Sequence, residues 1–227
     1  IQRAIELALR MGLEGTEAWT TTLINAATSQ RAAGNLDQAE DLFEQALDAA
    51  RRTYGPDDRR LAALHNNRSM LFSQTHRRRQ AIDELHESLR ILEHSSVDAQ
   101  SDVDIASTCT NLALAMLDGE DQPTDAELEE AQSLARRTLD IYQHAGSDSS
   151  AHYASALAGA AHVSFASEDY AEAVRQYQRA LDVIARCYGE HTDYYRVTAQ
   201  NLQEAQRKLE LTQSTDNPHD SVDDSPA

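Results

Sequence analysis

The sequence predicts an all-α protein built as a stack of antiparallel helix pairs. Glycine and proline, which break helices, number only 8 and 4 among 227 residues, whereas Ala, Leu, Glu, Gln and Arg are abundant. Apolar residues recur at helical spacing along most of the chain. The same pattern returns about every 42 residues, which is typical of a repeat architecture.

Pairs of matching residues set the period. Two pairs are 42 residues apart, and a third is 134 apart, which is three periods plus eight. We place two of the extra residues near 95–97 and six in a turn at 118–125, where Gly119 and Pro123 interrupt the helical pattern. The matching pairs are Gln38-Ala39 with Gln80-Ala81, Ala131 with Ala173, and Tyr54-Gly55 with Tyr188-Gly189.

Each period holds two predicted helices, and both ends of the chain differ from this pattern. Residues 1–12 match the second helix of a pair, which predicts a truncated first repeat. A polar helix at 192–211 suits a solvated cap at the end of a stack. The acidic, proline-containing segment 212–227 predicts a disordered tail. We therefore expect a repeat domain over 1–211, with repeats at 16–54, 57–94, 98–145 and 148–188.

Small residues occupy matching positions where paired helices must approach closely. Within each pair the first two small residues are 12 apart, except in the third pair, which carries the six-residue insertion. A bulky side chain at any of these positions would push two helices apart. The small residues are Ala27, Ser69, Ala113 and Ala161, then Ala39, Ala81, Ala131 and Ala173, and then Ala46, Ser88, Thr138 and Ala180.

This spacing of small residues in two-helix units resembles the tetratricopeptide repeat. The 42-residue period and the Tyr-Gly linkers at 54–55 and 188–189 resemble the kinesin-light-chain-like subtype, which has many bacterial members. Asn66-Asn67 and Asn111-Leu112-Ala113 match part of its Asn-Asn-Leu-Ala signature. The resemblance covers about residues 1–211 and implies a right-handed superhelical solenoid of about four repeats plus a capping helix. It implies a scaffold rather than a chemistry.

The resemblance also implies where a ligand would bind, because the first helices of such repeats line a concave groove. Asparagine offers donors and acceptors, so a ladder of asparagines can hydrogen-bond the backbone of an extended peptide. The alternative is that these side chains bond an adjacent helix or a turn. Gly159 interrupts the ladder in the fourth repeat. The predicted groove residues are Asn25, Asn66, Asn67, Met70, Asn111, Leu114, His162 and Asn201.

No pattern indicates catalysis, a metal or a cofactor. The nine histidines lack ligand spacing, and there is no phosphate-binding loop or nucleophile elbow. Cys109 and Cys187 lie in separate helical segments, which favours two thiols over a disulfide or a nucleophile and indicates a cytoplasmic protein. We expect no enzyme activity. The presence of 19 arginines beside one lysine, Lys208, hints at a GC-rich bacterial genome.

Charge limits the classes of partner. A formal net charge of −18 disfavours binding to nucleic acids and to anionic membranes, and no segment is long and apolar enough to span a bilayer. Residues 51–79 nevertheless hold eight arginines. Most simply these stabilise the fold at a solvated surface. The alternatives are an acidic protein partner, self-association or, least favoured, nucleic acid.

The sequence thus predicts a protein–protein interaction scaffold that binds a peptide segment of a partner in its concave groove. The alternative is an oligomerising or sensor segment of a larger bacterial regulatory protein, with self-association as its expected property. The sequence does not reveal the identity of the partner.

Overall fold

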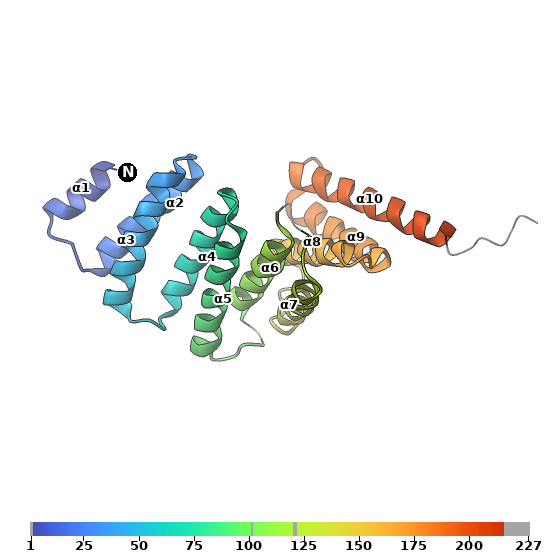
Figure 1. Cartoon of the computed structure of the whole chain (residues 1–227), viewed down its shortest axis with the longest axis horizontal. Helices are drawn as coiled ribbons and strands as arrows, with labels where there is room; N and C mark the ends of the chain where they lie inside the picture. Colours follow the sequence, from blue (N-terminus) through green and yellow to red (C-terminus); the bar gives the residue numbers. More distant parts are fainter. Residues whose placement is uncertain (1, 101, 120–121, 216–227) are drawn as a thin grey trace, which may run out of the picture.

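The computed structural model describes residues 2–100, 102–119 and 122–215, and within them the chain is an elongated row of helices (Figure 1). The helices follow one another along the long axis of the molecule in chain order, and no strand is present in the described part. They are α1 (Gln2–Arg10), α2 (Glu17–Ala32), α3 (Leu36–Tyr54), α4 (Arg59–Gln74), α5 (Arg78–Ser95), α6 (Val103–Leu117), α7 (Asp125–His144), α8 (Ala151–Ala166), α9 (Tyr170–Tyr188) and α10 (Asp193–Thr215).

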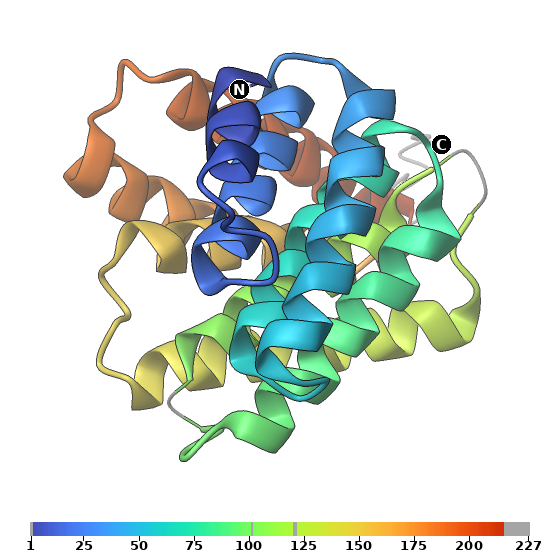
Figure 2. The ribbon, with the colours of Figure 1, turned by 90° about the vertical axis from the view of Figure 1, so that its left-hand side faces the viewer.

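Consecutive helices form four antiparallel pairs, which we call the first repeat (α2 and α3), second (α4 and α5), third (α6 and α7) and fourth (α8 and α9). The short helix α1 packs on α2, and α10 packs on α9. In the view along the row, α1 lies in front and the later repeats lie behind it (Figure 2). Because each repeat contacts mainly its neighbours, the stack is a solenoid.

Three of the four pairs share one tight turn. A residue with positive φ ends the first helix at Gly34 (79°), His76 (57°) and Glu168 (62°). The next residue then donates its backbone N–H to a carbonyl five residues earlier, as in Asn35 to Gln30 at 2.9 Å. Glycine adopts this backbone conformation without strain, so the histidine and the glutamate hold it at some cost.

The third pair has a longer connection, as the sequence predicted. Helix α6 ends at Leu117 and α7 begins at Asp125, where Thr124 and Glu127 form a reciprocal capping box. Arg78 of the second repeat fastens this connection to α5. Its guanidinium donates to the backbone oxygen of Met116 and, at 2.8 Å, to the Glu127 carboxylate.

All twelve small residues identified from the sequence are buried, with no more than 2% of any residue exposed. Two of them also make matching hydrogen bonds. The Ser88 hydroxyl donates to the Ala62 carbonyl at 2.9 Å, and the Thr138 hydroxyl donates to the Ala106 carbonyl at 3.2 Å. Alanine and short hydroxyl side chains therefore occupy these contact positions, which allows the helices of each pair to pack closely.

The chain ends differ from the predicted bounds. Helix α1 stops at Arg10 rather than at residue 12. Helix α10 continues to Thr215, so the predicted cap at 192–211 ended four residues too early and the predicted tail began too early. The hydroxyls of Thr212 and Ser214 donate to carbonyls of the preceding turn, which keeps these polar residues compatible with a helix. Residues 216–227 lie outside the described part of the chain.

Candidate functional site

Four of the predicted asparagines occupy one position in successive first helices. Asn25, Asn67, Asn111 and Asn201 each lie eight residues after the first residue of α2, α4, α6 and α10 respectively. Gly159 holds the same position in α8. The ladder predicted from the sequence is thus a set of structurally equivalent positions along the stack.

The interruption at Gly159 has a steric cause. Helices α6 and α8 approach closely, whereas α4 and α6 do not. A Cβ atom placed on Gly159 would lie 3.0 Å from Cγ2 of Thr110 and 3.7 Å from Cδ1 of Leu114. An asparagine therefore does not fit there unless α6 and α8 separate.

Two hollows lie on the side of the stack that carries the ladder. The first, here called the apolar hollow, has a volume of about 470 Å³, and the second, the polar hollow, about 320 Å³. The apolar hollow is lined by Met70, Leu85, Leu114, Ala115 and Leu117, together with Arg31, Ser69, Ser73, Gln74, Asn111, Asp118 and His162. The polar hollow is lined by Arg59, Ala63, Asn66, Asn67, Leu92, Asp104, Ser107, Thr108 and Asn111.

The two hollows adjoin at Asn111, which lines both of them. Six of the eight predicted groove residues line a hollow. Met70, Leu114 and His162 border the apolar hollow, and Asn66 and Asn67 border the polar one. Asn25 and Asn201 are exposed and border neither hollow.

Asn66 differs from the other asparagines because it joins three helices. Its Nδ2 lies 2.6 Å from Oγ of Ser88 in α5 and 2.8 Å from Oγ1 of Thr108 in α6. Its Oδ1 accepts a hydrogen bond from Nδ2 of Asn111 at 3.1 Å. Asn66 is half-buried, and its hydrogen-bonding capacity is taken up within the chain, so here the structural alternative describes the side chain better than direct ligand contact.

Charged groups of both signs border the apolar hollow. Arg31 forms no ion pair with another described residue, and its Nε is buried without a hydrogen-bond partner. Asp118 is exposed at the same hollow. The His162 side chain reaches solvent, yet the protein atoms crowded around it desolvate the imidazole and lower its pKa. The imidazole therefore enters the hollow as a mainly neutral group at pH 7.

Sequence reasoning missed Arg31, Ser73 and Leu117, and a signal for them existed. Each lies six residues after a ladder asparagine on the same helix, so the three hold one equivalent position in successive first helices. A search of the repeats for further equivalent positions beside the ladder would have found them. Leu85 gave no such signal, because it reaches the hollow from the second helix of its repeat.

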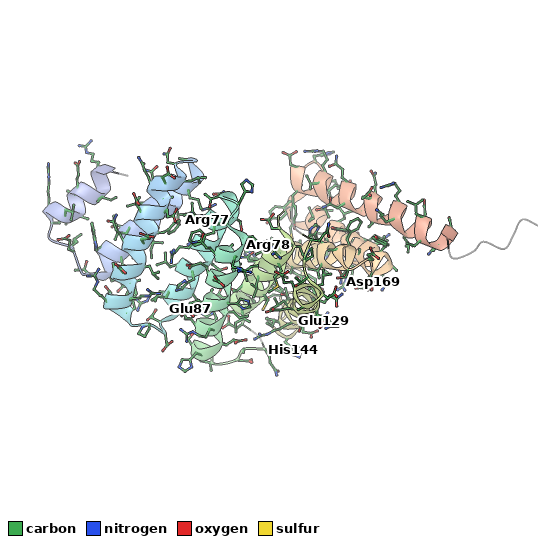
Figure 3. All side chains as sticks on the ribbon, viewed as in Figure 1. Arg77, Arg78, Glu87, Glu129, His144 and Asp169 are labelled. Carbon is green, nitrogen blue, oxygen red and sulfur yellow. The ribbon has the colours of Figure 1, made fainter. Side chains whose placement is uncertain are left out.

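The arginine-rich segment 51–79 is largely neutralised inside the chain. Arg59 contacts Asp102 and Asp104, each at 2.6 Å, and Arg77 contacts Glu40 at 2.7 Å. Arg60, Arg68 and Arg78 also pair with carboxylates. Figure 3 labels Arg77 and Arg78, which stand side by side at the start of α5 but bind different neighbouring repeats. These contacts support the structural interpretation of the segment.

One carboxylate of this set is strongly perturbed. Asp102 lies next to the Arg59 guanidinium, accepts a hydrogen bond from the Ser96 hydroxyl at 2.7 Å and caps the start of α6. The hydrogen bonds from Arg59 are the largest cause that lowers the pKa of Asp102 from 3.8 to about 2. The pairing also raises the pKa of Arg59. Asp102 is thus ionised throughout the physiological range.

The remaining reactive groups do not form a second site. Desolvation raises the pKa of the buried Cys109 thiol to about 11, which makes it a poor nucleophile. Cys187 is exposed and unpaired by disulfide. No cluster of His, Cys, Asp or Glu within the described residues has the arrangement of a metal site. Among these same residues, no helix combines the length and apolar character needed to cross a membrane.

Solved structures with this architecture are helical-repeat proteins. The crystal structure of BtubC (BKLC) from P. vanneervenii superposes with a TM-score of 0.65 at 18% identity, over 100% of this chain and 92% of that one. A putative kinesin light chain from Podospora anserina with nearly identical TPR-like repeats superposes at 0.64 and 15% identity, over 88% of this chain and 96% of that one. A point variant of that fungal protein superposes with a TM-score of 0.64 at 15% identity, over 87% of this chain and 94% of that one.

The class defined by these observations is that of a helical-repeat solenoid. Residues 20–94 match the family model of the tetratricopeptide repeat, so this part of the chain belongs to that family, and the helices on both sides continue the same fold. A comparison with curated proteins gave no significant match. The predicted all-α solenoid is therefore confirmed, and the predicted tetratricopeptide family is confirmed for residues 20–94. Tetratricopeptide repeats generally serve as protein–protein interaction scaffolds and are generally not catalytic.

Proposed function

We propose that this chain binds an extended peptide segment of a partner protein along the first helices of its repeats. The observation that carries this proposal is the position of Asn67 and Asn111 at two adjoining hollows. The Asn67 side chain makes no hydrogen bond within the described part of the chain, and Asn111 makes only one, to Asn66. Both amides therefore retain capacity to bond the backbone of a ligand.

The two hollows suit different parts of a peptide. The polar hollow presents amides and hydroxyls, which match the backbone N–H and C=O groups of an extended strand. The apolar hollow beside it presents Met70, Leu85 and Leu114, and the flexible Met70 is 45% exposed. A large apolar side chain of the ligand would bury this surface. We expect this side chain to contribute affinity, while the amides fix the position of the backbone.

Charge is not expected to decide the choice of ligand at the apolar hollow. Arg31 and Asp118 contribute opposite charges to this hollow. The other residues that line it, apart from His162, have no ionisable side chain. A peptide with an apolar anchor and little net charge near it therefore fits best.

The experiment is a selection of 15-residue peptides from a random displayed library on the immobilised chain. Binding of a selected peptide is then measured by isothermal titration for the wild type, Asn111→Ala and Asn25→Ala. Asn25 is the matched control, because it holds the same helix position outside both hollows. We expect Asn111→Ala to weaken binding about 3- to 10-fold, which is the value of one hydrogen bond, and Asn25→Ala to leave it unchanged.

Equal affinity for all three proteins, with folding verified by circular dichroism, would move the binding site away from these hollows. Failure of the library to yield any binder that competes at the hollows would also contradict the proposal. Either result would direct attention to other faces of the solenoid.

Self-association remains the second candidate, and one observation favours it. Helix α1 exposes Leu7 and Leu9, and Met11 directly after it is exposed too, with exposed fractions of 56%, 45% and 63% respectively. Sedimentation velocity of the wild type and of Leu7→Ser/Met11→Ser tests this surface. A concentration-dependent dimer in the wild type that the double variant loses would support association through α1. A monomer at all concentrations would remove this candidate.

A further inference from the structure

The orientation of the Asn66 amide is fixed from the core outward. The Ser88 hydroxyl donates its hydrogen to the backbone oxygen of Ala62 at 2.9 Å, and Ser88 is fully buried. Its oxygen can then only accept a further hydrogen bond, and Nδ2 of Asn66 lies 2.6 Å away. A flipped Asn66 would place two acceptor oxygens against each other at this distance. The nitrogen end of Asn66 must therefore point toward Ser88.

The same network fixes the partner amide. The second N–H of Asn66 donates to Oγ1 of Thr108 at 2.8 Å, and Thr108 is also buried. This leaves Oδ1 of Asn66 at the other end of its amide, where it accepts from Nδ2 of Asn111 at 3.1 Å. Asn111 is exposed and lines both hollows, but its nitrogen end is bound to Asn66. Its oxygen is consequently at the end of the amide that has no partner within the described chain.

We infer that Asn66 is a positioning residue that orients Asn111, so that the site presents a fixed acceptor and selects a ligand segment with an N–H donor at that point. This inference rests on the proposed function and deepens it, because it assigns the polarity of one contact. The other ladder asparagines, Asn25, Asn67 and Asn201, have no side-chain hydrogen bond in the described part of the chain. Their amides can rotate to suit donor or acceptor, whereas Asn111 cannot.

The consequence for the ligand is specific. A backbone N–H meets the requirement in an extended peptide, but proline and N-methylated residues lack this hydrogen. A ligand with proline at the residue that contacts Asn111 should therefore bind poorly, although its apolar anchor still fits the apolar hollow.

The role of Asn66 in orienting Asn111 is tested by NMR on the complete chain without any ligand. The probe is the side-chain amide of Asn111, assigned by its disappearance in Asn111→Ala. We expect one Asn111 amide proton to exchange with water about 3- to 10-fold more slowly than the other, because a net hydrogen bond of this kind contributes a factor of that size. Asn66→Ala should remove the difference.

The outcome that overturns positioning is a persistent difference between the two protons in folded Asn66→Ala. Equal protons in the wild type would overturn it as well. The wild-type comparison needs no variant at residue 66, so it answers the question even if Asn66→Ala fails to fold, and Asn25→Ala again serves as the matched control. This part of the test gives its answer whether or not the library yields a peptide.

The ligand part uses the selected peptide and versions of it with single N-methylated residues. We expect Asn66→Ala and Asn111→Ala each to weaken binding about 3- to 10-fold and the double variant to weaken it no further, since the two residues act as one unit. One N-methylation should abolish the sensitivity to Asn111→Ala. Losses that multiply in the double variant, or no N-methylated position with this property, would overturn the inference.

Discussion

The second and third repeats are joined by polar contacts, whereas the third and fourth are joined by apolar packing. Across the former interface, Arg59 reaches Asp102 and Asp104, Arg137 reaches Glu93 at 2.5 Å, and the Asn66 amide links α4 to α6. Across the latter, no side chain of α6 or α7 forms a hydrogen bond or ion pair with α8 or α9 in the described part of the chain. Instead, Tyr142 meets Tyr153 edge to face, with ring centroids 5.8 Å apart.

The difference explains where the hollows lie. Arg59 and Asn66 bridge the space between α4 and α6 without filling it, and the polar hollow is the result. Gly159 lets α8 pack directly against α6, which brings these two first helices closer together than α4 and α6. Repeats with the same fold can therefore be open or closed on the ladder side, depending on a few side chains at each interface.

The largest expected effect concerns Asp102, which is only 9% exposed and binds Arg59, Ser96 and the start of α6. Asp102→Ala should lower the free energy of unfolding by about 3 kcal/mol, because it removes a helix cap and leaves a guanidinium without its main partner. Urea unfolding measures this value. Asp104→Ala is the matched control, since Asp104 shares Arg59 but is 62% exposed, and it should cost less than about 1 kcal/mol. Equal costs would show that burial of Asp102 does not matter.

The pH dependence of stability sharpens the same comparison. The folded-state pKa of Asp102 is about 2, below its ordinary 3.8, so its contribution is present above pH 3.8 and is lost as the pH falls toward 2. The stability difference between the wild type and Asp102→Asn should shrink by about 2 kcal/mol between pH 5 and pH 2. Thermal unfolding at a series of pH values checks this. A difference that stays constant would show that the Arg59 pair does not stabilise the ionised form.

On the apolar side, Gly159→Ala should destabilise the fourth repeat by about 1 kcal/mol, because overpacking against Thr110 outweighs the helix-forming advantage of alanine. The Thr110 hydroxyl donates to the Ala106 carbonyl at 3.1 Å, which holds the clashing methyl group in place. In a Thr110→Ser background, which lacks that methyl group, the same change should stabilise by about 0.5 kcal/mol. Hydrogen exchange of the backbone amides of α8 measures the change in stability in both backgrounds. A stabilising effect in the wild-type background would contradict the tight contact.

The smallest expected effect is that of one partly exposed ion pair. Arg77→Gln should lower the local stability of α3 and α5 by about 0.5 kcal/mol, because it removes the pair with Glu40 and the contact with the Phe72 ring. Hydrogen exchange at low and high salt is the measurement, and the wild type should lose part of this difference in about 0.5 M NaCl. Arg136→Gln is the control, since Arg136 is exposed and forms no ion pair within the described chain. If Arg77→Gln and Arg136→Gln changed the hydrogen exchange of α3 and α5 equally, the ion pair of Arg77 with Glu40 would have no role in stability.

The repeat architecture could be predicted because its signal is regular. Ala39 and Ala81 are one period apart, as are Ala131 and Ala173, and all four are buried where the helices of a pair meet. The connection between α6 and α7 could also be placed, because Gly119 and Pro123 interrupt the helical pattern there. The end of α10 could not, because its last turn is polar and is held by hydroxyls that bond the helix backbone.

The candidate site was predicted in part. Residue type located Asn67 and Asn111, but it could not separate them from Asn66, whose role depends on two hydroxyls brought in from α5 and α6. The ion pairs between repeats were also missed. Their members are separated by about one period, as in Arg60 with Glu17 and Arg137 with Glu93, so a search for opposite charges one repeat apart would have found them.

The charges at the repeat junctions also fix the order of the modules. Glu17 is the first residue of α2, and Arg59 is the first residue of α4, so the two hold the same place in successive repeats. Arg60 of the second repeat faces Glu17 of the first. If the second repeat were duplicated in tandem, Arg60 of the new copy would face Arg59 of the old one, and two like charges would meet. The arrangement of units along this chain is thus not freely interchangeable, and an engineer who wishes to lengthen it must rewrite the junction charges along with the insert.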